Sequence, residues 1–248
     1  MSEETCKPLN VDLSGQVAIV TGASRGVGRE TALTLARAGL ILFLAARTKA
    51  GLDDAVAEIE AEGGQATSIP TDVTQANSVQ NLVDLVTQQV GRIDLLVNNA
   101  GVGVFQPLAE SDPDDWLQVI HSNLTSTYLC SRAVLPAMIF QKSGQIINML
   151  SIAAKVAFPA ASAYCAAKAG ALALTKVLRE EVRAEGIRVT AVLPGSIDST
   201  FWDGMEQHPD LNLMLKPNHI AETILRLVQA PVEMTVEEIT VTPPLGIL

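Results

Sequence analysis

The chain has 248 residues, 48% of them hydrophobic, which is long enough to bury a large core. With 17 lysines and arginines against 27 aspartates and glutamates, its net charge of −10 opposes non-specific binding to nucleic acid or anionic membranes. Three cysteines without a paired spacing indicate a reducing compartment. We therefore expect a cytoplasmic protein with a single domain over residues 1–248, in which residues 1–13 are an N-terminal extension.

Short apolar runs alternate with longer helical patterns along the chain. The runs predict strands at 16–21, 40–46, 66–70, 92–98, 144–150, 187–193 and 235–242, and helices are predicted at 26–38, 49–62, 75–90, 112–140 and 161–184. Because the runs are apolar throughout, the strands should be covered on both faces. The pattern predicts an α/β fold, a doubly wound parallel sheet of about seven strands with helices on both faces. The run at 40–46 is too short to span a bilayer.

A glycine-rich loop, "TGASRGVG" at 21–28, follows the first predicted strand and leads into the first helix. Gly22 would allow a sharp turn, Gly26 would let backbone amides approach a pyrophosphate, and Gly28 would let the helix and the strand pack closely. The spacing G-x-x-x-G-x-G differs from the commoner dinucleotide pattern. For this loop alone, a tight turn without a ligand is an equal alternative.

The end of the second predicted strand bears on the choice between NAD and NADP. In NAD-binding folds an acidic residue there binds the adenosine ribose, whereas NADP needs a basic side chain. Here Ala46 stands at the acidic position, Arg47 follows it, and Arg25 lies in the glycine loop. Two guanidinium groups would meet the 2′-phosphate, so the sequence predicts NADP(H). The alternative is that Arg47 is an ordinary surface arginine.

Polar residues also follow the third and fourth predicted strands, at the same edge of the sheet. Asp72 either accepts a hydrogen bond from an adenine amino group or caps the helix from 75, and both interpretations stay open. Asn98 and Asn99 end the fourth strand, where open α/β sheets bind ligands. Their amides either line a crevice or tie neighbouring loops together.

Tyr164 and Lys168 stand four positions apart in an alanine-rich helical run and should project from one face. A nearby ammonium favours the phenolate, so we expect the pKa of Tyr164 to move from about 10 toward neutrality. Such a tyrosine can donate a proton to a carbonyl oxygen as hydride reaches its carbon. Ser151 could bond the substrate oxygen, and Asn123 could hold a water that links Lys168 to solvent. The alternatives are a closely packed alanine helix and an interior asparagine.

These motifs occur together in the order and spacing of a known family. Over residues 14–242 the chain resembles the short-chain dehydrogenase/reductase family. The resemblance is carried by the glycine loop, "NNAG" at 98–101, Asn123, Ser151, Tyr164, Lys168 and "PGSIDST" at 194–200. It implies a Rossmann-like fold and a catalytic tetrad of Asn123, Ser151, Tyr164 and Lys168.

The resemblance also implies how a cofactor binds. Lys168 would bond the nicotinamide ribose, Ile197 and Thr200 would hold the carboxamide, and Asn99 and Asp72 would lie on the adenosine side. The implied cofactor-binding residues are Gly22, Ser24, Arg25, Gly26, Val27, Gly28, Arg47, Asp72, Val73, Asn99, Ala100, Gly101, Tyr164, Lys168, Pro194, Gly195, Ile197 and Thr200. Members of the family are mostly tetramers or dimers, so we expect a homo-oligomer with the helices at 112–140 and 161–184 in an interface.

The substrate is expected to be a small carbonyl compound or alcohol. Residues 196–217 would form the lid, which carries Phe201, Trp202, Met205, Leu211, Leu213, Met214 and Leu215. Uncharged residues should also face the pocket: Val102, Val104, Ile152, Ala153 and Phe158. The lid favours a hydrophobic substrate, although a lid must in any case bury apolar side chains against the body.

Three functions follow, and we rank an NADPH-dependent ketone or aldehyde reductase first. A 3-oxoacyl-[acyl-carrier-protein] reductase would offer basic side chains to its acidic partner; by spacing, Lys142 keeps one such position, while Glu185 occupies another and would repel that partner. A regulator that senses NADP(H) without turnover has no use for the pair of Tyr164 and Lys168. No metal is expected, because His121, His208 and His219 lack ligand spacing.

Overall fold

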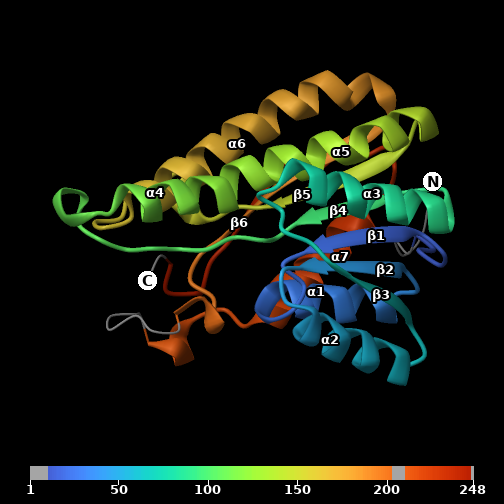
Figure 1. Cartoon of the computed structure of the whole chain (residues 1–248), viewed down its shortest axis with the longest axis horizontal. Helices are drawn as coiled ribbons and strands as arrows, with labels where there is room; N and C mark the ends of the chain where they lie inside the picture. Colours follow the sequence, from blue (N-terminus) through green and yellow to red (C-terminus); the bar gives the residue numbers. More distant parts are fainter. Residues whose placement is uncertain (1–10, 203–209, 247–248) are drawn as a thin grey trace, which may run out of the picture.

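Seven parallel strands form one sheet in the computed structural model, which describes residues 11–202 and 210–246 (Figure 1). The strands are β1 (Val17–Thr21), β2 (Ile41–Ala46), β3 (Gln65–Pro70), β4 (Leu95–Asn98), β5 (Gly144–Met149), β6 (Ile187–Pro194) and β7 (Glu238–Val241). Their order is β3-β2-β1-β4-β5-β6-β7, and every neighbouring pair is parallel. The predicted doubly wound parallel sheet is confirmed.

Helices cover both faces of this sheet (Figure 1). They are α1 (Gly26–Arg37), α2 (Lys49–Ala61), α3 (Ala76–Val90), α4 (Pro113–Ile120), α5 (Ser126–Gln141), α6 (Ser162–Val182) and α7 (Pro217–Val228). One core cluster joins the sheet to α1, α2 and α7, and a second joins it to α3, α5 and α6. Two separate apolar layers therefore enclose the strands.

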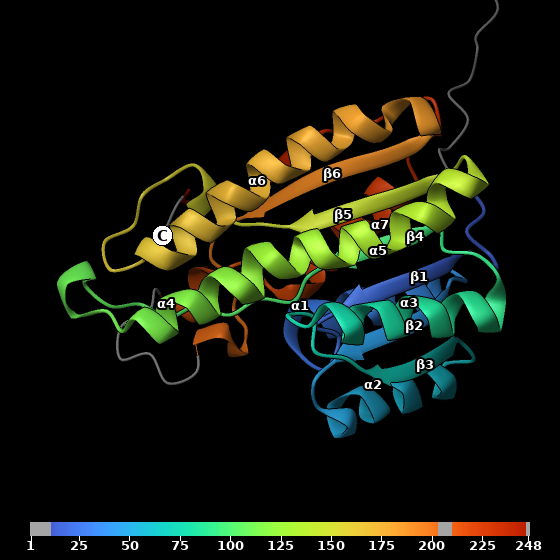
Figure 2. The same cartoon turned by 45° about the horizontal axis from the view of Figure 1, so that its top comes forward.

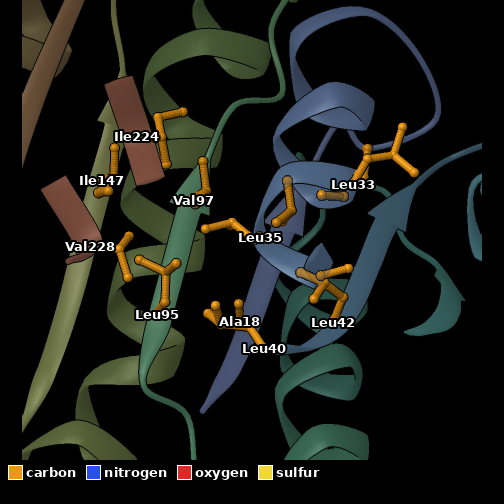
Figure 3. Packing of buried hydrophobic residues seen from close by; sticks show 14 of the residues in the cluster. Ala18, Leu33, Leu35, Leu40, Leu42, Leu95, Val97, Ile147, Ile224 and Val228 are labelled. Carbon is orange, nitrogen blue, oxygen red and sulfur yellow. The ribbon is translucent and has the colours of Figure 1, made fainter. Parts of the chain in front are cut away.

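Strand residues alternate between these two layers, since successive side chains of a strand point to opposite faces. Ala18 and Val20 of β1 belong to the cluster under α1, α2 and α7, whereas Val17 and Ile19 belong to the other cluster. Figure 3 shows the first layer, in which Leu35 of α1 lies among the side chains of the central strands. All five residues of β1 are buried, which explains why its sequence shows no polar alternation.

Two helical predictions need correction. The helix expected over 112–140 is two α-helices, α4 and α5, joined by a five-residue π-helical turn, His121–Thr125. Helix α7 was not predicted, although Pro217 at its first turn and buried Ile220, Ile224 and Val228 carry a helical spacing. The apolar face of α7 covers the sheet next to α1, where Figure 3 shows Ile224 and Val228 facing Ile147 and Val97.

The topology fixes where a ligand can bind. Strand β1 pairs with β2 on one side and β4 on the other, and α1 and α5 lie on opposite faces of the sheet. At such a switch point the loops that leave two neighbouring strands diverge and open a crevice. All strands point toward the end of the molecule from which α4 projects (Figure 2), so the predicted site residues gather at that end.

Some predicted features fall outside the described residues. These are most of the N-terminal extension with Cys6, and Met205 and His208 in the predicted lid. The side chain of Thr200 is likewise not described. Across residues 11–202 and 210–246, no helix is both long and apolar enough to cross a membrane.

Candidate active site

The glycine loop turns sharply at the carboxyl end of β1. Gly22 and Gly26 have φ angles of +67° and +56°, which favour glycine over other residues. Helix α1 starts at Gly26, and Arg25 before it makes no capping hydrogen bond through its side chain; no acidic residue lies in the first turn. The amide groups and positive dipole end of this helix are thus oriented as a pyrophosphate requires. The residues present fit a dinucleotide.

Gly28 is the closest packed of the loop glycines. A Cβ atom at this position would overlap the carbonyl oxygen of Gly22 and the Nδ2 atom of Asn99. Gly28→Ala should therefore push the glycine loop away from the loop after β4, at a cost of about 1–3 kcal/mol of folding free energy. We expect a lower thermal midpoint and a raised KM for the cofactor. Gly170→Ala in α6 is the control for an added methyl group, since a Cβ atom at this helical position would meet only the flexible side chain of Leu124, 3.0 Å from its Cδ2. If Gly28→Ala keeps the wild-type midpoint and KM, the close packing has no consequence.

The two asparagines at the end of β4 tie elements together. Asn98 is buried, and its Nδ2 donates to Ser131 Oγ at 3.0 Å and to Asn148 Oδ1 at 2.8 Å. Asn99 Nδ2 donates to the carbonyl of Thr21 at 3.0 Å, which locks the loop after β4 onto the end of β1. Tying of loops, one of the two interpretations open from sequence, thus describes Asn99, whereas the Asn98 amide ties β4 to α5 and β5. An adenosine role for Asn99 stays a prediction.

The predicted 2′-phosphate site carries positive charge at the surface. Arg25 and Arg47 are both exposed, and within the described ranges neither is in an ion pair. Asp72 bonds locally, since its Oδ1 accepts from the amide of Thr74 at 2.9 Å and from its hydroxyl at 2.7 Å. These bonds, with a smaller contribution from the charge of Arg47, hold the pKa of Asp72 below its usual value. Gln75 rather than Asp72 is the N-cap of α3, so the capping interpretation is wrong, and the adenine role stays a prediction.

The other residues predicted on the adenosine and pyrophosphate side lie around these loops. Ser24 packs close to Gly51 of α2, and Val27 packs against the core beneath α1. Val73 is buried in the opposite core layer. The amide of Ala100 donates to Thr21 Oγ1 at 3.1 Å. The loop after β1 is thus in contact with the loop after β4 and with α2.

Tyr164 and Lys168 lie together on α6, as their spacing predicts. The Lys168 Nζ atom is 5.5 Å from the centroid of the Tyr164 ring and donates to the carbonyl of Met149 at 2.9 Å. Lys168 is only 5% exposed. Ser151 follows β5 and interacts with the Tyr164 hydroxyl; its Oγ also accepts from the amide of Ala153 at 3.1 Å. A phenol, a hydroxyl and an ammonium therefore converge at the ends of β5 and α6.

The pKa of Tyr164 differs from the expectation in the sequence analysis. Burial raises the pKa of Tyr164 to about 12, and the interaction with Ser151 only partly opposes that shift. Burial lowers the pKa of Lys168 to about 8. Because burial disfavours the charged form of each group, the phenol of Tyr164 stays protonated at neutral pH. The expectation of a lowered pKa for Tyr164 is therefore wrong.

The shifted pKa of Lys168 makes folding stability depend on pH. In the unfolded chain a lysine has a pKa of about 10.4, so between about pH 8 and 10 the unfolded state binds more protons and stability rises with pH. Above about pH 10 the raised pKa of Tyr164 acts in the opposite direction. Urea unfolding at pH 8 and pH 10 should show wild type gaining about 2 kcal/mol relative to Lys168→Met. A difference that does not change with pH would contradict this account.

Asn123 lies in the π-helical turn between α4 and α5. It is 1% exposed, and its Nδ2 donates to the carbonyls of Val102 and Val119 at 2.8 and 2.9 Å. Its Oδ1 is buried without a hydrogen-bond partner among the described residues. A Cβ atom on Gly101 would overlap this Oδ1 and lie 3.7 Å from Lys168 Nζ. A buried acceptor therefore points to the space beside Gly101, close to the lysine.

The residues predicted to bind the nicotinamide lie in the segment after β6. Pro194 ends β6 in register with Val241, and the amide of Gly195 donates to the carbonyl of Val241 at 2.8 Å. Ile197 forms an isolated parallel bridge with Leu215. Met214 and Leu215 are buried, whereas Leu211 and Leu213 are exposed, so the predicted lid buries only part of its apolar side chains.

Four aromatic side chains, Phe105, Tyr164, Phe201 and Trp202, form a cluster that the sequence analysis did not predict. The ring centroids of Phe105 and Phe201 lie 5.9 and 5.6 Å from that of Tyr164. Trp202 stacks on Phe105 at 6.5 Å and meets Phe201 edge-on at 5.4 Å. Phe105 was missed because it lies in the loop after β4, where only its position near "NNAG" could have indicated a role.

Comparison with known proteins gives a consistent result. The family model described as short chain dehydrogenase matches residues 16–210. A 3-oxoacyl-[acyl-carrier-protein] reductase from Synechocystis sp. is 39% identical over 88% of this chain and 91% of its own length. A sepiapterin reductase from Chlorobaculum tepidum is 33% identical over 93% of this chain and 97% of its own length. Relatives of comparable similarity thus carry the names of different reductases.

A solved structure agrees with the fold. The crystal structure of a metagenomic short-chain oxidoreductase in complex with NADP has 37% sequence identity and a TM-score of 0.84. The match covers 94% of this chain and 99% of that one.

Proposed function

This chain belongs to the short-chain dehydrogenase/reductase family and is an oxidoreductase, and we propose that it is an NADPH-dependent reductase of a ketone or aldehyde. The observation that carries the proposal is the convergence of Tyr164, Lys168 and Ser151 at the carboxyl end of the sheet. The preference for NADPH rests on Arg47 and Arg25, and the NADP complex of a similar structure supports it.

When bound, NADPH would supply the hydride that reduces the carbonyl carbon. Tyr164 donates its hydroxyl proton to the carbonyl oxygen, so that the C=O group gains one hydride and one proton and becomes an alcohol. Ser151 orients that oxygen through its hydroxyl. Because the phenol of Tyr164 is protonated at neutral pH, it is in the form that reduction of a carbonyl requires.

Lys168 and Asn123 prepare the next turnover. With a pKa of about 8, Lys168 carries its ammonium at neutral pH and stabilises the phenolate that remains after proton donation. The unpartnered Oδ1 of Asn123 supports a bound water between that residue and Lys168, through which the proton is replaced. The ammonium of Lys168 would also bond the nicotinamide ribose.

Reduction of 3-oxoacyl groups on an acyl-carrier protein is the second candidate, because a relative of 39% identity has that name. An acidic carrier protein needs free cations at its docking site. Lys142, which keeps one position expected for docking, is in an ion pair with Glu185. That pairing favours a free small-molecule substrate, and we rank the ketone or aldehyde reductase first.

Steady-state oxidation of NADPH with a panel of ketones, aldehydes and 3-oxoacyl thioesters tests the proposal. We expect turnover with ketones or aldehydes and no gain when the thioester is attached to an acyl-carrier protein. A strong preference for the carrier-bound thioester would favour the second candidate. Binding of NADPH without any turnover would favour a regulator that senses the cofactor.

A homo-oligomer remains our expectation, with α4, α5 and α6 in the interface. In support, Tyr128 of α5 and Val177 of α6 expose 47% and 56% of their surface. Size-exclusion chromatography with light scattering should give the mass of a dimer or tetramer, and a monomer at micromolar concentration would contradict this.

A further inference from the structure

The aromatic cluster of Phe105, Tyr164, Phe201 and Trp202 is assembled from three distant parts of the sequence. Phe105 comes from the loop after β4, Tyr164 from α6, and Phe201 and Trp202 from the short helical turn after β6. Three separate loops and helices thus bring aromatic rings against the residue that donates the proton. Phe105 and Phe201 thus lie directly against the Tyr164 ring.

The backbone next to the cluster leaves room for the rings. A Cβ atom on Gly103 would lie 2.5 Å from Phe201 Cζ and 2.7 Å from Phe105 Cε2. Only a residue without a side chain lets both rings approach the loop. The positions of Phe105 and Phe201 therefore depend on the shape of this loop and not only on contact between the rings.

The surface of the cluster is apolar and carries little charge. All four residues are half-buried. The one polar atom of Trp202, its Nε1, donates to the carbonyl of Ile197 at 2.8 Å. Asp198, the acidic residue that precedes the cluster in the described part of this segment, forms an ion pair with Lys216 at 2.7 Å. Within residues 196–202 and 210–217, the part of this segment that the structure describes, the ion pair of Asp198 with Lys216 leaves little free charge beside the rings.

We propose that Phe105, Phe201 and Trp202 select flat aromatic ketones or aldehydes over saturated ones of the same size. This inference rests on the proposed function, because it names the substrate class of the same site. The ring of an aromatic substrate can make the same kind of aromatic contact with these side chains that they make with one another. A saturated substrate fills the same volume but makes no aromatic contact. Aromatic pairs contribute about 0.5–1.5 kcal/mol beyond area burial, which corresponds to about 2- to 10-fold in kcat/KM.

Acetophenone and cyclohexyl methyl ketone form a matched pair for the test. They share a carbon skeleton and differ only in the unsaturation of the ring. Because conjugation also changes the reactivity of the carbonyl, the quantity to compare is the change in the kcat/KM ratio between enzyme variants. We expect Phe105→Leu, and separately Trp202→Leu, to lower the ratio of acetophenone to cyclohexyl methyl ketone about 3- to 10-fold.

Phe140→Leu is the matched control, since Phe140 is 92% exposed on α5 and far along the chain from the cluster. Its ratio should equal that of wild type. An unchanged ratio in both folded cluster variants, or an equal fall in Phe140→Leu, would overturn the inference. Thermal midpoints show which variants are folded. If Phe105→Leu is not folded, the ratio measured for Trp202→Leu tests the inference.

The same pair separates this inference from the proposed function. If wild type reduces neither ketone, their dissociation constants for the complex with NADPH are compared instead. Tighter binding of acetophenone that is lost in Phe105→Leu supports the aromatic site even when the proposed reductase function fails. Turnover of many ketones with no response of the ratio to Phe105→Leu leaves the reductase function in place and removes the aromatic preference.

Discussion

Tyr164→Phe should lower kcat for carbonyl reduction about 10²- to 10⁴-fold while leaving the dissociation constant of NADPH nearly unchanged. The substitution removes the hydroxyl that we propose as the proton donor, but it keeps the ring that contacts Phe105 and Phe201. Stopped-flow or steady-state absorbance of NADPH gives the rate, and isothermal titration gives the affinity.

The control for this substitution is the other tyrosine of the chain. Tyr128 lies on α5 and is 47% exposed, so Tyr128→Phe removes the same hydroxyl at a site without a proposed role in proton transfer. We expect wild-type kcat for that variant. Equal rates for Tyr164→Phe and Tyr128→Phe would show that proton donation comes from another group.

Arg47→Asp should turn the preference for NADPH toward NADH. Hydrogen bonds to charged groups contribute about 1.5–3 kcal/mol, so losing one to the 2′-phosphate costs about 10- to 150-fold in kcat/KM for NADPH. The new carboxylate also repels that phosphate and can accept hydrogen bonds from the ribose diol of NADH. The measured quantity is the ratio of kcat/KM for NADPH to that for NADH.

Arg226→Asp is a matched control for the change in charge. Arg226 is exposed on α7 and, among the described residues, takes part in no ion pair. The cofactor ratio should stay at its wild-type value in that variant. If Arg47→Asp leaves the ratio unchanged as well, the arginine is an ordinary surface residue and the cofactor preference has another origin.

The sheet and most of its helices could be predicted from the sequence, because continuous apolar runs and glycine turns depend on neighbours along the chain. The strand from 41 to 46 and the turn at Gly22 are examples. Helix α7 carried a readable pattern that was overlooked. The π-helical turn at Asn123 was beyond prediction, since its residues have no distinctive propensity and its geometry depends on contacts with Val102 across the fold.

The sequence predicted which residues belong to the site better than it predicted the surroundings that set their protonation. The spacing of Tyr164 and Lys168 gives their proximity on one helix face. Their protonation depends on how completely surrounding groups exclude water, and that information lies in Phe105, Phe201 and Ser151, which are distant in sequence. The sequence shows only that Lys142 and Glu185 carry opposite charges; the fold brings them together as an ion pair.

The indole of Trp202 is an intrinsic fluorophore, and its hydrogen bond to the carbonyl of Ile197 holds it where the carboxamide of a nicotinamide is expected to bind. The chain has one other tryptophan, Trp116, which lies on α4 and packs against a small apolar cluster of α4 and α6 residues. In a Trp116→Phe background the whole indole emission comes from Trp202. Cofactor and substrate occupancy of the crevice can then be followed optically in real time, without a label and without turnover.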